Sequence, residues 1–219
     1  MSDRQQGVIL LHGLARTRLS MRSLASYLSR QNYAVLNVGY PSRHFPVERL
    51  AQDVLPPALA TFRRQDVGTV HFVTHSMGGI VLRSFLAADG ILPELGRVVM
   101  LSPPNQGSEL VDLWRSFFWF RWFFGPAGCQ LGTDPCSLPN RLGPARFALG
   151  IITGDRPLQG FGHFFSEPND GKVTVSRAKL AGMSDFLVLP YGHSMIMVHR
   201  PVHEQVGCFL KTGRFQRAG

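Results

Sequence analysis

A serine in a favourable setting for nucleophilic chemistry is the first feature of the chain. Residues 74–79 read THSMGG, so Ser76 stands between a short apolar run and a helical pattern that starts at Met77. A serine on a tight turn between a buried strand and a helix is held above the edge of a sheet, with its hydroxyl exposed. Gly78 and Gly79 follow where such a turn needs room. We therefore predict that Ser76 is a nucleophile.

The same hexapeptide has a second interpretation. A serine before a helix is also a common N-cap, and the glycines then serve close packing of the helix on a strand. Thr74 moreover stands where the G-x-S-x-G form of the turn has glycine. We treat Thr74 as a variant, because a β-branched residue is favourable in a strand. The motif needs partners elsewhere in the chain.

An acid and a base are expected downstream in the order Ser, Asp, His, each in a loop after a strand. His193 follows the predicted strand that ends at Leu189. Asp170 lies in an Asn-Asp-Gly turn, whereas Asp155 comes directly after the strand that ends near residue 153. We favour Asp170, because turn formation beside Gly154 alone explains Asp155.

Two further histidines, His199 and His203, are four residues apart. Pro201 lies between them and no H-E-x-x-H motif is present, so we predict ordinary surface histidines and no metal site.

The end of the first predicted strand supplies a complementary feature. Residues 10–14 read LLHGL, and Gly13 lets the next loop pass close to the nucleophile. The N–H groups of Leu14 and Met77 are then the expected oxyanion hole, since the first amides of a helix have no partner within it. On its own, His12-Gly13 is equally well a simple turn between a strand and a helix.

The elements that position these residues alternate along the chain. Short apolar runs, typical of parallel strands buried on both faces, occupy residues 8–12, 34–38, 70–74, 98–101, 148–152 and 186–189. Helical patterns separate most of them, at residues 19–30, 47–65, 77–88, 173–181 and 201–211. The alternation predicts one α/β domain over residues 1–219, with a doubly wound, mostly parallel sheet of about six strands.

One connection is much longer than the rest. Residues 103–146 join two predicted strands and are rich in Phe and Trp, so we predict a lid-like insertion. In the part from Leu110 to Phe118, apolar residues share one helical side. This side either binds acyl chains or a membrane interface, or packs as core over the sheet. We place His12, Trp114, Phe117 and Phe118 among the residues that would contact a substrate.

Composition narrows the class of protein. The chain is 44% hydrophobic and 17% charged, as expected for a globular domain. Its net charge of +9 comes from scattered arginines with no nucleic-acid motif, so no nucleic-acid partner is predicted. No run is long enough to span a membrane, and the first ten residues show no export signal, so a cytoplasmic location is expected. Cys129 and Cys136 are close enough to pair in an oxidising compartment, leaving Cys208 free.

Together, these motifs and the stretches SPPNQGS at 102–108, NDG at 169–171 and YGH at 191–193 resemble the α/β-hydrolase superfamily, in its lipase and esterase branch. The chain is similar to small bacterial lipases and to hydrolases like GPI inositol-deacylase. The resemblance implies a Ser76, Asp170 and His193 triad, an oxyanion hole at Leu14 and Met77, and no cofactor. With the aromatic segment over the site, we expect hydrolysis of lipid-like or other apolar esters. An amidase, thioesterase or acyltransferase would use the same triad. A silent hydrolase fold that serves as a binding module is the remaining alternative.

Overall fold

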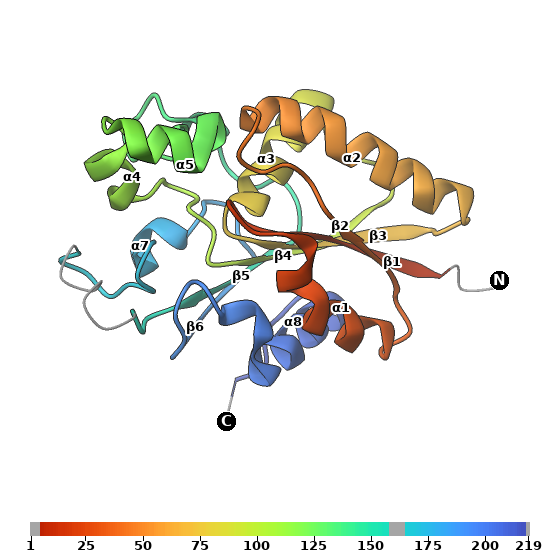
Figure 1. Cartoon of the computed structure of the whole chain (residues 1–219). Coiled ribbons are helices and arrows are strands. Elements are labelled where there is room, and N and C mark those ends of the chain that lie inside the picture. Colours follow the sequence, from red (N-terminus) through yellow and green to blue (C-terminus); the bar gives the residue numbers. More distant parts are fainter. Residues whose placement is uncertain (1–4, 158–164, 218–219) are drawn as a thin grey trace.

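A single parallel sheet forms the centre of the molecule (Figure 1). The computed structural model describes residues 5–157 and 165–217, so the first four residues of the amino-terminal segment discussed above lie outside it. The six predicted strands are confirmed, and all five neighbouring pairs are parallel in the order β2-β1-β3-β4-β5-β6. They are β1 (Gln6–Leu11), β2 (Ala34–Val38), β3 (Thr69–His75), β4 (Leu95–Leu101), β5 (Leu149–Gly154) and β6 (Asp185–Leu189).

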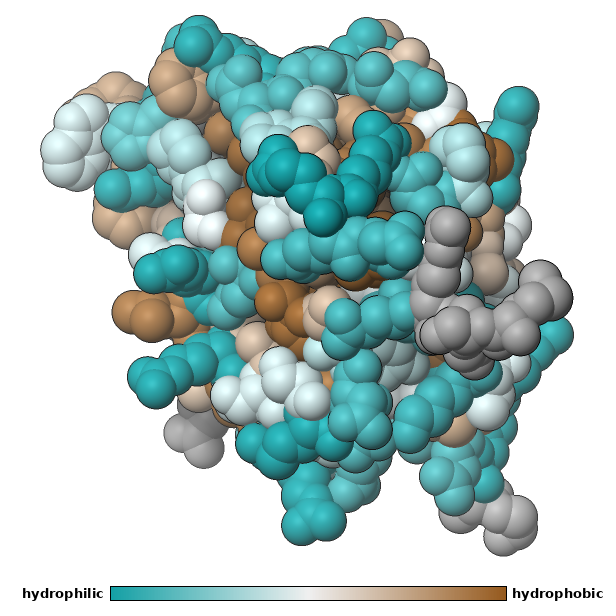
Figure 2. Space-filling view, turned by 90° about the vertical axis from the view of Figure 1, so that its right-hand side faces the viewer, coloured by the Kyte–Doolittle hydropathy of each residue, from teal (hydrophilic) through white to brown (hydrophobic). Residues whose placement is uncertain are grey.

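Both faces of the sheet are covered, which explains the continuous apolar runs of its strands. Ile9 and Leu11 of β1 pack into the core beneath α2 (Val47–Arg64) and α3 (Met77–Asp89). Val8 and Leu10 pack into the opposite core beneath α1 (Arg22–Ser29) and α8 (Arg200–Thr212). Side chains along a strand alternate between faces, so one short run supplies both cores. Polar side chains cover most of the surface seen in Figure 2, with hydrophobic residues in a band between them.

The long connection over residues 103–146 lies beyond the carboxyl ends of the strands, on the side of α2 and α3 (Figure 1). It contains α4 (Glu109–Trp114), α5 (Phe118–Cys129) and α6 (Leu138–Arg141). The expected continuous helical side from Leu110 to Phe118 is wrong, because residues 115–117 separate α4 from α5. Arg115 at this break binds the carboxylates of Asp112 and Asp134.

A buried arginine of α3 anchors this connection to the sheet layer. The Arg83 guanidinium donates to four oxygen atoms: the carbonyls of Asn105, Pro139 and Gly143 and the Oδ1 of Asn105. Asn105 in turn donates from Nδ2 to the Ala178 carbonyl at 2.9 Å. Burial lowers the pKa of Arg83 to about 10, so the group stays cationic at neutral pH. The start and the end of the connection are therefore tied to one side chain.

The remaining short elements precede or follow these layers. A 3-10 turn, η1 (Arg18–Met21), leads into α1, and η3 (Ile196–Val198) leads into α8. The helix α7 (Val175–Ala178) is shorter than the predicted span of 173–181, since Thr174 caps its start and Lys179 is already extended. The three cysteines are free thiols, so Cys129 and Cys136 are not paired. Within the described residues, no helix is long and apolar enough to cross a bilayer.

Candidate active site

Ser76 occupies a strained turn at the carboxyl end of β3. Its φ of 52° and ψ of −125° lie outside the regions that non-glycine residues favour. Hydrogen bonds hold the turn on both sides: the Ser76 N–H donates to the Leu101 carbonyl at 2.8 Å, and the Gly79 N–H donates to the Ser76 carbonyl at 2.9 Å. The strain is thus imposed by the β3–α3 junction and by the neighbouring strand β4. The turn presents the serine at the sheet edge, as the motif predicted.

The two glycines after Ser76 have different structural tasks. A Cβ on Gly78 would lie 2.7 Å from the Leu11 carbonyl oxygen, so only glycine lets α3 approach the end of β1 this closely. A Cβ on Gly79 would lie 3.2 Å from Oγ1 of Thr74. The space that Thr74 needs is therefore provided by Gly79, which explains why this turn tolerates a β-branched residue before the serine.

The structure brings Ser76, His193 and Asp170 into one hydrogen-bonded row. His193 Nε2 lies 2.9 Å from Ser76 Oγ, and His193 Nδ1 lies 2.9 Å from Asp170 Oδ2. The side chain of Asp170 is completely buried and that of His193 is almost so. The Asp170 carboxylate fixes the proton of His193 on Nδ1, which leaves Nε2 free to accept the serine proton.

Backbone groups of the acid's own loop complete the surroundings of Asp170. Its Oδ1 accepts from the N–H groups of Lys172 and Val173 at 3.0 and 2.9 Å, and its carbonyl accepts from the His193 N–H. Burial alone would raise the pKa of Asp170, but His193 and the Val173 N–H outweigh it and hold the pKa below its usual value. The carboxylate therefore stays ionised at neutral pH.

The rival acid, Asp155, lies elsewhere. Its carboxylate is partly exposed, and the nearest charged partner is Arg156 at 3.8 Å. Its backbone N–H donates to the Leu189 carbonyl, which fits a residue that ends β5. Of the two candidates, the structure brings Asp170 to the histidine.

His75 was given no role in the sequence analysis, yet it supports the base. Its Nε2 donates to the His193 carbonyl at 3.0 Å, and the two rings are 5.2 Å apart. Burial, with the neighbouring His193, lowers the pKa of His75 far below its usual value, so this imidazole is neutral. It is a positioning residue for the His193 loop. The sequence carries no signal for this role beyond adjacency to Ser76.

The two expected oxyanion donors flank the serine. Met77 is the first residue of α3, and Leu14 lines the cavity in front of Ser76. Among the described residues, neither N–H has a hydrogen-bond acceptor. Both amides are therefore available to an oxyanion at this edge.

His12 does not reach the site, so its expected contact with substrate is wrong. The side chain is completely buried and stacks on Tyr40 with ring centroids 4.1 Å apart. Its Nδ1 donates to the Gly13 carbonyl, and its Nε2 accepts from the Tyr40 N–H. Both nitrogens are thus occupied in holding the loop that carries Leu14. His203 is also buried, against the prediction of a surface residue, and it bonds the Met197 carbonyl.

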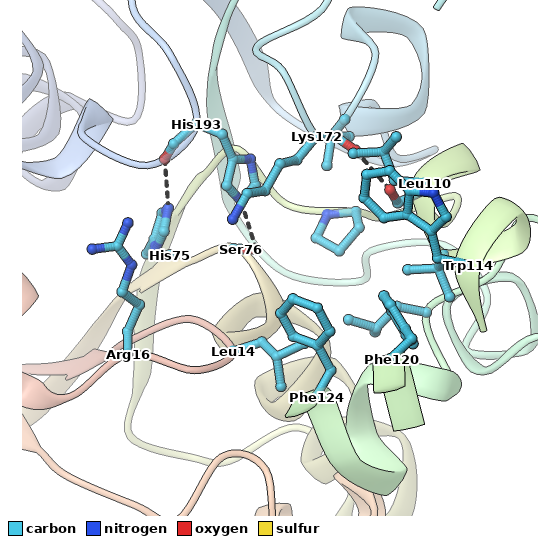
Figure 3. A pocket seen from close by; sticks show the side chains of 15 residues that line it. Leu14, Arg16, His75, Ser76, Leu110, Trp114, Phe120, Phe124, Lys172 and His193 are labelled. Carbon is cyan, nitrogen blue, oxygen red and sulfur yellow. Dashed lines mark hydrogen bonds between the residues drawn. The ribbon is translucent and has the colours of Figure 1, made fainter. Parts of the chain in front are cut away.

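A cavity of about 110 Å³ opens in front of Ser76 and His193 (Figure 3). Trp114, Phe120 and Phe124 line one side of it, together with aliphatic residues of α4. Phe117 and Phe118 do not line it, and Phe118 is 82% exposed. The break between α4 and α5 rotates these two side chains outward and brings Phe120 inward. Of the predicted substrate contacts, only Trp114 faces the cavity.

The chain is similar to solved structures of lipolytic enzymes. It superposes on the mature lipase BlEst2 of Bacillus licheniformis with a TM-score of 0.70 and 20% identity, over 97% of this chain and 93% of that one. It superposes on the phospholipase PlaB of Legionella pneumophila with a TM-score of 0.71 and 17% identity, over 95% of this chain and 57% of that one. The chain has the α/β-hydrolase fold.

Further comparisons agree with this fold. A metagenomic carboxyl esterase matches with a TM-score of 0.66 and 18% identity, over 88% of this chain and 65% of that one. Comparison with protein-family models gives no match. Comparison with the sequences of curated proteins gives none either. The evidence for chemistry in this α/β-hydrolase fold is therefore the arrangement of Ser76, His193 and Asp170.

Proposed function

We propose that the protein is a serine hydrolase of carboxylic esters with an apolar acyl group. The observation that carries the proposal is the row of two 2.9 Å hydrogen bonds from Ser76 through His193 to Asp170. The lipases and esterases that share the fold support the same reaction class.

Each residue of the site has a step in the reaction. His193 Nε2 takes the Ser76 proton as Oγ attacks the ester carbonyl carbon. The oxyanion that forms accepts hydrogen bonds from the Leu14 and Met77 N–H groups. His193 then gives the proton to the leaving alcohol, and an acyl-enzyme remains. Water then attacks the acyl carbon while His193 takes its proton, and His193 returns this proton to Ser76 Oγ as the carboxylic acid leaves. The ionised Asp170 stabilises the imidazolium during acylation and during deacylation.

The aromatic side of the cavity supports an apolar acyl group. Trp114, Phe120 and Phe124 are contributed by α4 and α5, and Leu110 and Val111 continue the same wall. Hydrocarbon placed against these side chains leaves water, which stabilises binding by about 25 cal/mol per Å² of buried apolar surface. The wall is mostly hydrocarbon and aromatic ring, which favours an apolar acyl chain.

A second apolar region lies outside the cavity, and we propose that it contacts a lipid interface. This aromatic surface consists of exposed side chains on α4, α5 and the break between them: Leu113, Phe117, Phe118, Trp119, Trp122 and Phe123. Arg43 lies over the Phe123 ring at 5.3 Å, and Arg121 belongs to the same helix. Exposed aromatics with adjacent cations are typical of peripheral binding to anionic membranes.

Hydrolysis of p-nitrophenyl esters tests the proposal. We expect wild-type turnover to increase from acetate to the longer acyl chains, and Ser76→Ala to lose it by at least about 10⁴-fold. Ser23→Ala, which changes an exposed serine of α1, is the matched control and keeps wild-type rates. Turnover by Ser76→Ala at the wild-type rate, or no turnover of any ester by the folded wild type, would contradict it.

A further inference from the structure

Two cations lie beside the nucleophile and have no task in the reaction described above. Arg16 and Lys172 both line the cavity that contains Ser76 and His193. In Figure 3, Arg16 lies beyond His75, on the side opposite Trp114 and Phe120, and the Lys172 side chain extends toward His193 and Ser76. The cavity therefore has an aromatic side and a cationic side, with the nucleophile between them.

Both cations belong to loops that carry residues of the site. Arg16 comes two residues after the oxyanion donor Leu14, and its Nη2 donates to the Ser194 carbonyl at 3.1 Å. Lys172 comes two residues after Asp170. Its N–H binds the Asp170 carboxylate, and its carbonyl accepts from Ser108 Oγ at 2.6 Å. The Arg16 guanidinium and the Lys172 backbone are therefore held next to the reacting residues.

Among the lining residues that the structure describes, none has an acidic side chain to neutralise the pair. Within residues 5–157 and 165–217, the Lys172 ammonium has no hydrogen bond or ion pair, and the nearby Asp170 is taken by His193 and by backbone amides. Desolvation and the charge of Arg16 lower the pKa of Lys172, although Asp170 opposes this. The charge of Arg16 thus acts on the Lys172 ammonium, and a bound anion would offset both positive charges.

We propose that Arg16 and Lys172 form an anion subsite that selects esters whose alcohol part carries a phosphate. The inference rests on the proposed hydrolase function and extends it to the substrate class. The acyl chain lies against the aromatic side, so the leaving alcohol is directed to the cationic side. Charge-assisted hydrogen bonds from a guanidinium and an ammonium to a phosphate are among the stronger polar contacts in proteins.

Matched substrate pairs test this subsite. The soluble pair is 1-butanoylglycerol and 1-butanoylglycerol 3-phosphate, and the lipid pair is 1-oleoylglycerol and 1-oleoylglycerol 3-phosphate in neutral detergent micelles. For both pairs we expect the wild type to have a kcat/KM at least about tenfold higher for the phosphorylated member. High salt should reduce this ratio.

Variants of the two cations identify its source. Arg16→Met and Lys172→Met should each lower the ratio about tenfold, while Lys172→Arg keeps most of it. Lys179→Met removes an exposed charge from outside the cavity, next to Phe186, and should leave the ratio unchanged. A preference confined to the micellar pair would mean attraction to a charged interface and would overturn the subsite, as would a ratio that is the same in all variants.

A binding measurement separates this inference from the hydrolase proposal. Ser76→Ala cannot form an acyl-enzyme, so titration calorimetry with the soluble pair reports recognition alone. We expect tighter binding of the phosphorylated member, and loss of the difference when Lys172→Met is added. Absence of turnover by the wild type would contradict the hydrolase, whereas equal binding of both members to Ser76→Ala would contradict the anion subsite.

Discussion

The sheet edge and the aromatic insertion at residues 103–146 meet at one cavity but are built in opposite ways. At the sheet edge, the side chains of Asp170 and His193 are buried and paired: Asp170 is completely enclosed, and both its oxygens accept hydrogen bonds. In the insertion, large apolar side chains are exposed, with Trp122 at 84%. A buried polar group is stable only when it is paired, whereas an exposed aromatic group gains most when a ligand covers it. The edge is organised before substrate arrives, and the insertion presents surface to be covered.

The largest effect that tests this contrast comes from the two rival acids. Asp170→Asn replaces the carboxylate that orients His193 and should lower kcat on p-nitrophenyl butanoate by about 10⁴-fold. Asp155→Asn alters a partly exposed side chain and should change kcat less than about twofold. Steady-state kinetics of both variants measures the difference. Equal losses of kcat in the two variants would contradict the assignment of Asp170 as the carboxylate that acts on His193.

The anchor between the two regions gives the next effect. Arg83→Met leaves four oxygen atoms, three of them in buried hydrogen bonds, without this donor and should lower the free energy of unfolding by about 3 kcal/mol. Denaturant titration measures this loss. Arg18→Met, at an exposed arginine of η1, is the matched control. An Arg83→Met protein as stable as the control would mean that the insertion does not depend on this anchor.

The aromatic surface should affect interfaces and not chemistry. Phe118→Ser together with Trp122→Ser should weaken binding to anionic vesicles about tenfold, because two exposed rings no longer enter the interface. The same variant should hydrolyse a soluble butanoyl ester within about twofold of the wild type. Vesicle sedimentation and soluble-ester kinetics give the two values. A loss of soluble-ester activity with unchanged vesicle binding would contradict the proposal that the aromatic surface contacts a lipid interface.

The smallest expected effect is a pH dependence of the sheet. Burial lowers the pKa of His71 to about 4, while in the unfolded chain its pKa is the ordinary histidine value of about 6.5. Between these values the unfolded state binds more protons, so the stability present above pH 6.5 is lost as pH falls. We expect His71 to contribute a loss of about 1 kcal/mol between pH 7 and pH 5.5. The free energy of unfolding of His71→Gln, measured between pH 7 and pH 5.5, should depend less steeply on pH than that of the wild type. An unchanged slope would exclude His71 as the source.

The sequence predicted the sheet edge well because its signals are local. A buried strand followed directly by Ser76, Gly78 and Gly79 can adopt few backbone conformations. Residues that follow β5 and β6 must meet at the carboxyl edge of the parallel sheet. The sequence favoured Asp170 over Asp155, and Asp170 is the carboxylate that lies against His193 in the structure. The parallel pairing of the six strands and the helices on both faces of the sheet followed from the same alternation, whereas the strand order was not predicted.

The insertion was predicted less well because its side chains are placed by distant contacts. The break at residues 115–117 depends on Arg115 meeting Asp134, and the bend in α5 at Gly125 places its Cα against the Arg43 carbonyl. Neither contact leaves a periodic signal. Phe120 and Phe124 therefore line the cavity in the place expected for Phe117 and Phe118. His12 was misplaced for a related reason, since Tyr40, its partner, lies in another loop.

Labelling with a fluorophosphonate probe tests the central claim most directly. The probe reacts with a serine hydroxyl only where a base activates it, so mass spectrometry of the labelled protein identifies the nucleophile. We predict one adduct, on Ser76, that is absent in Ser76→Ala and strongly reduced in His193→Ala. A folded wild-type protein that takes up no probe, or an adduct on another serine that persists in His193→Ala, would contradict the proposed site.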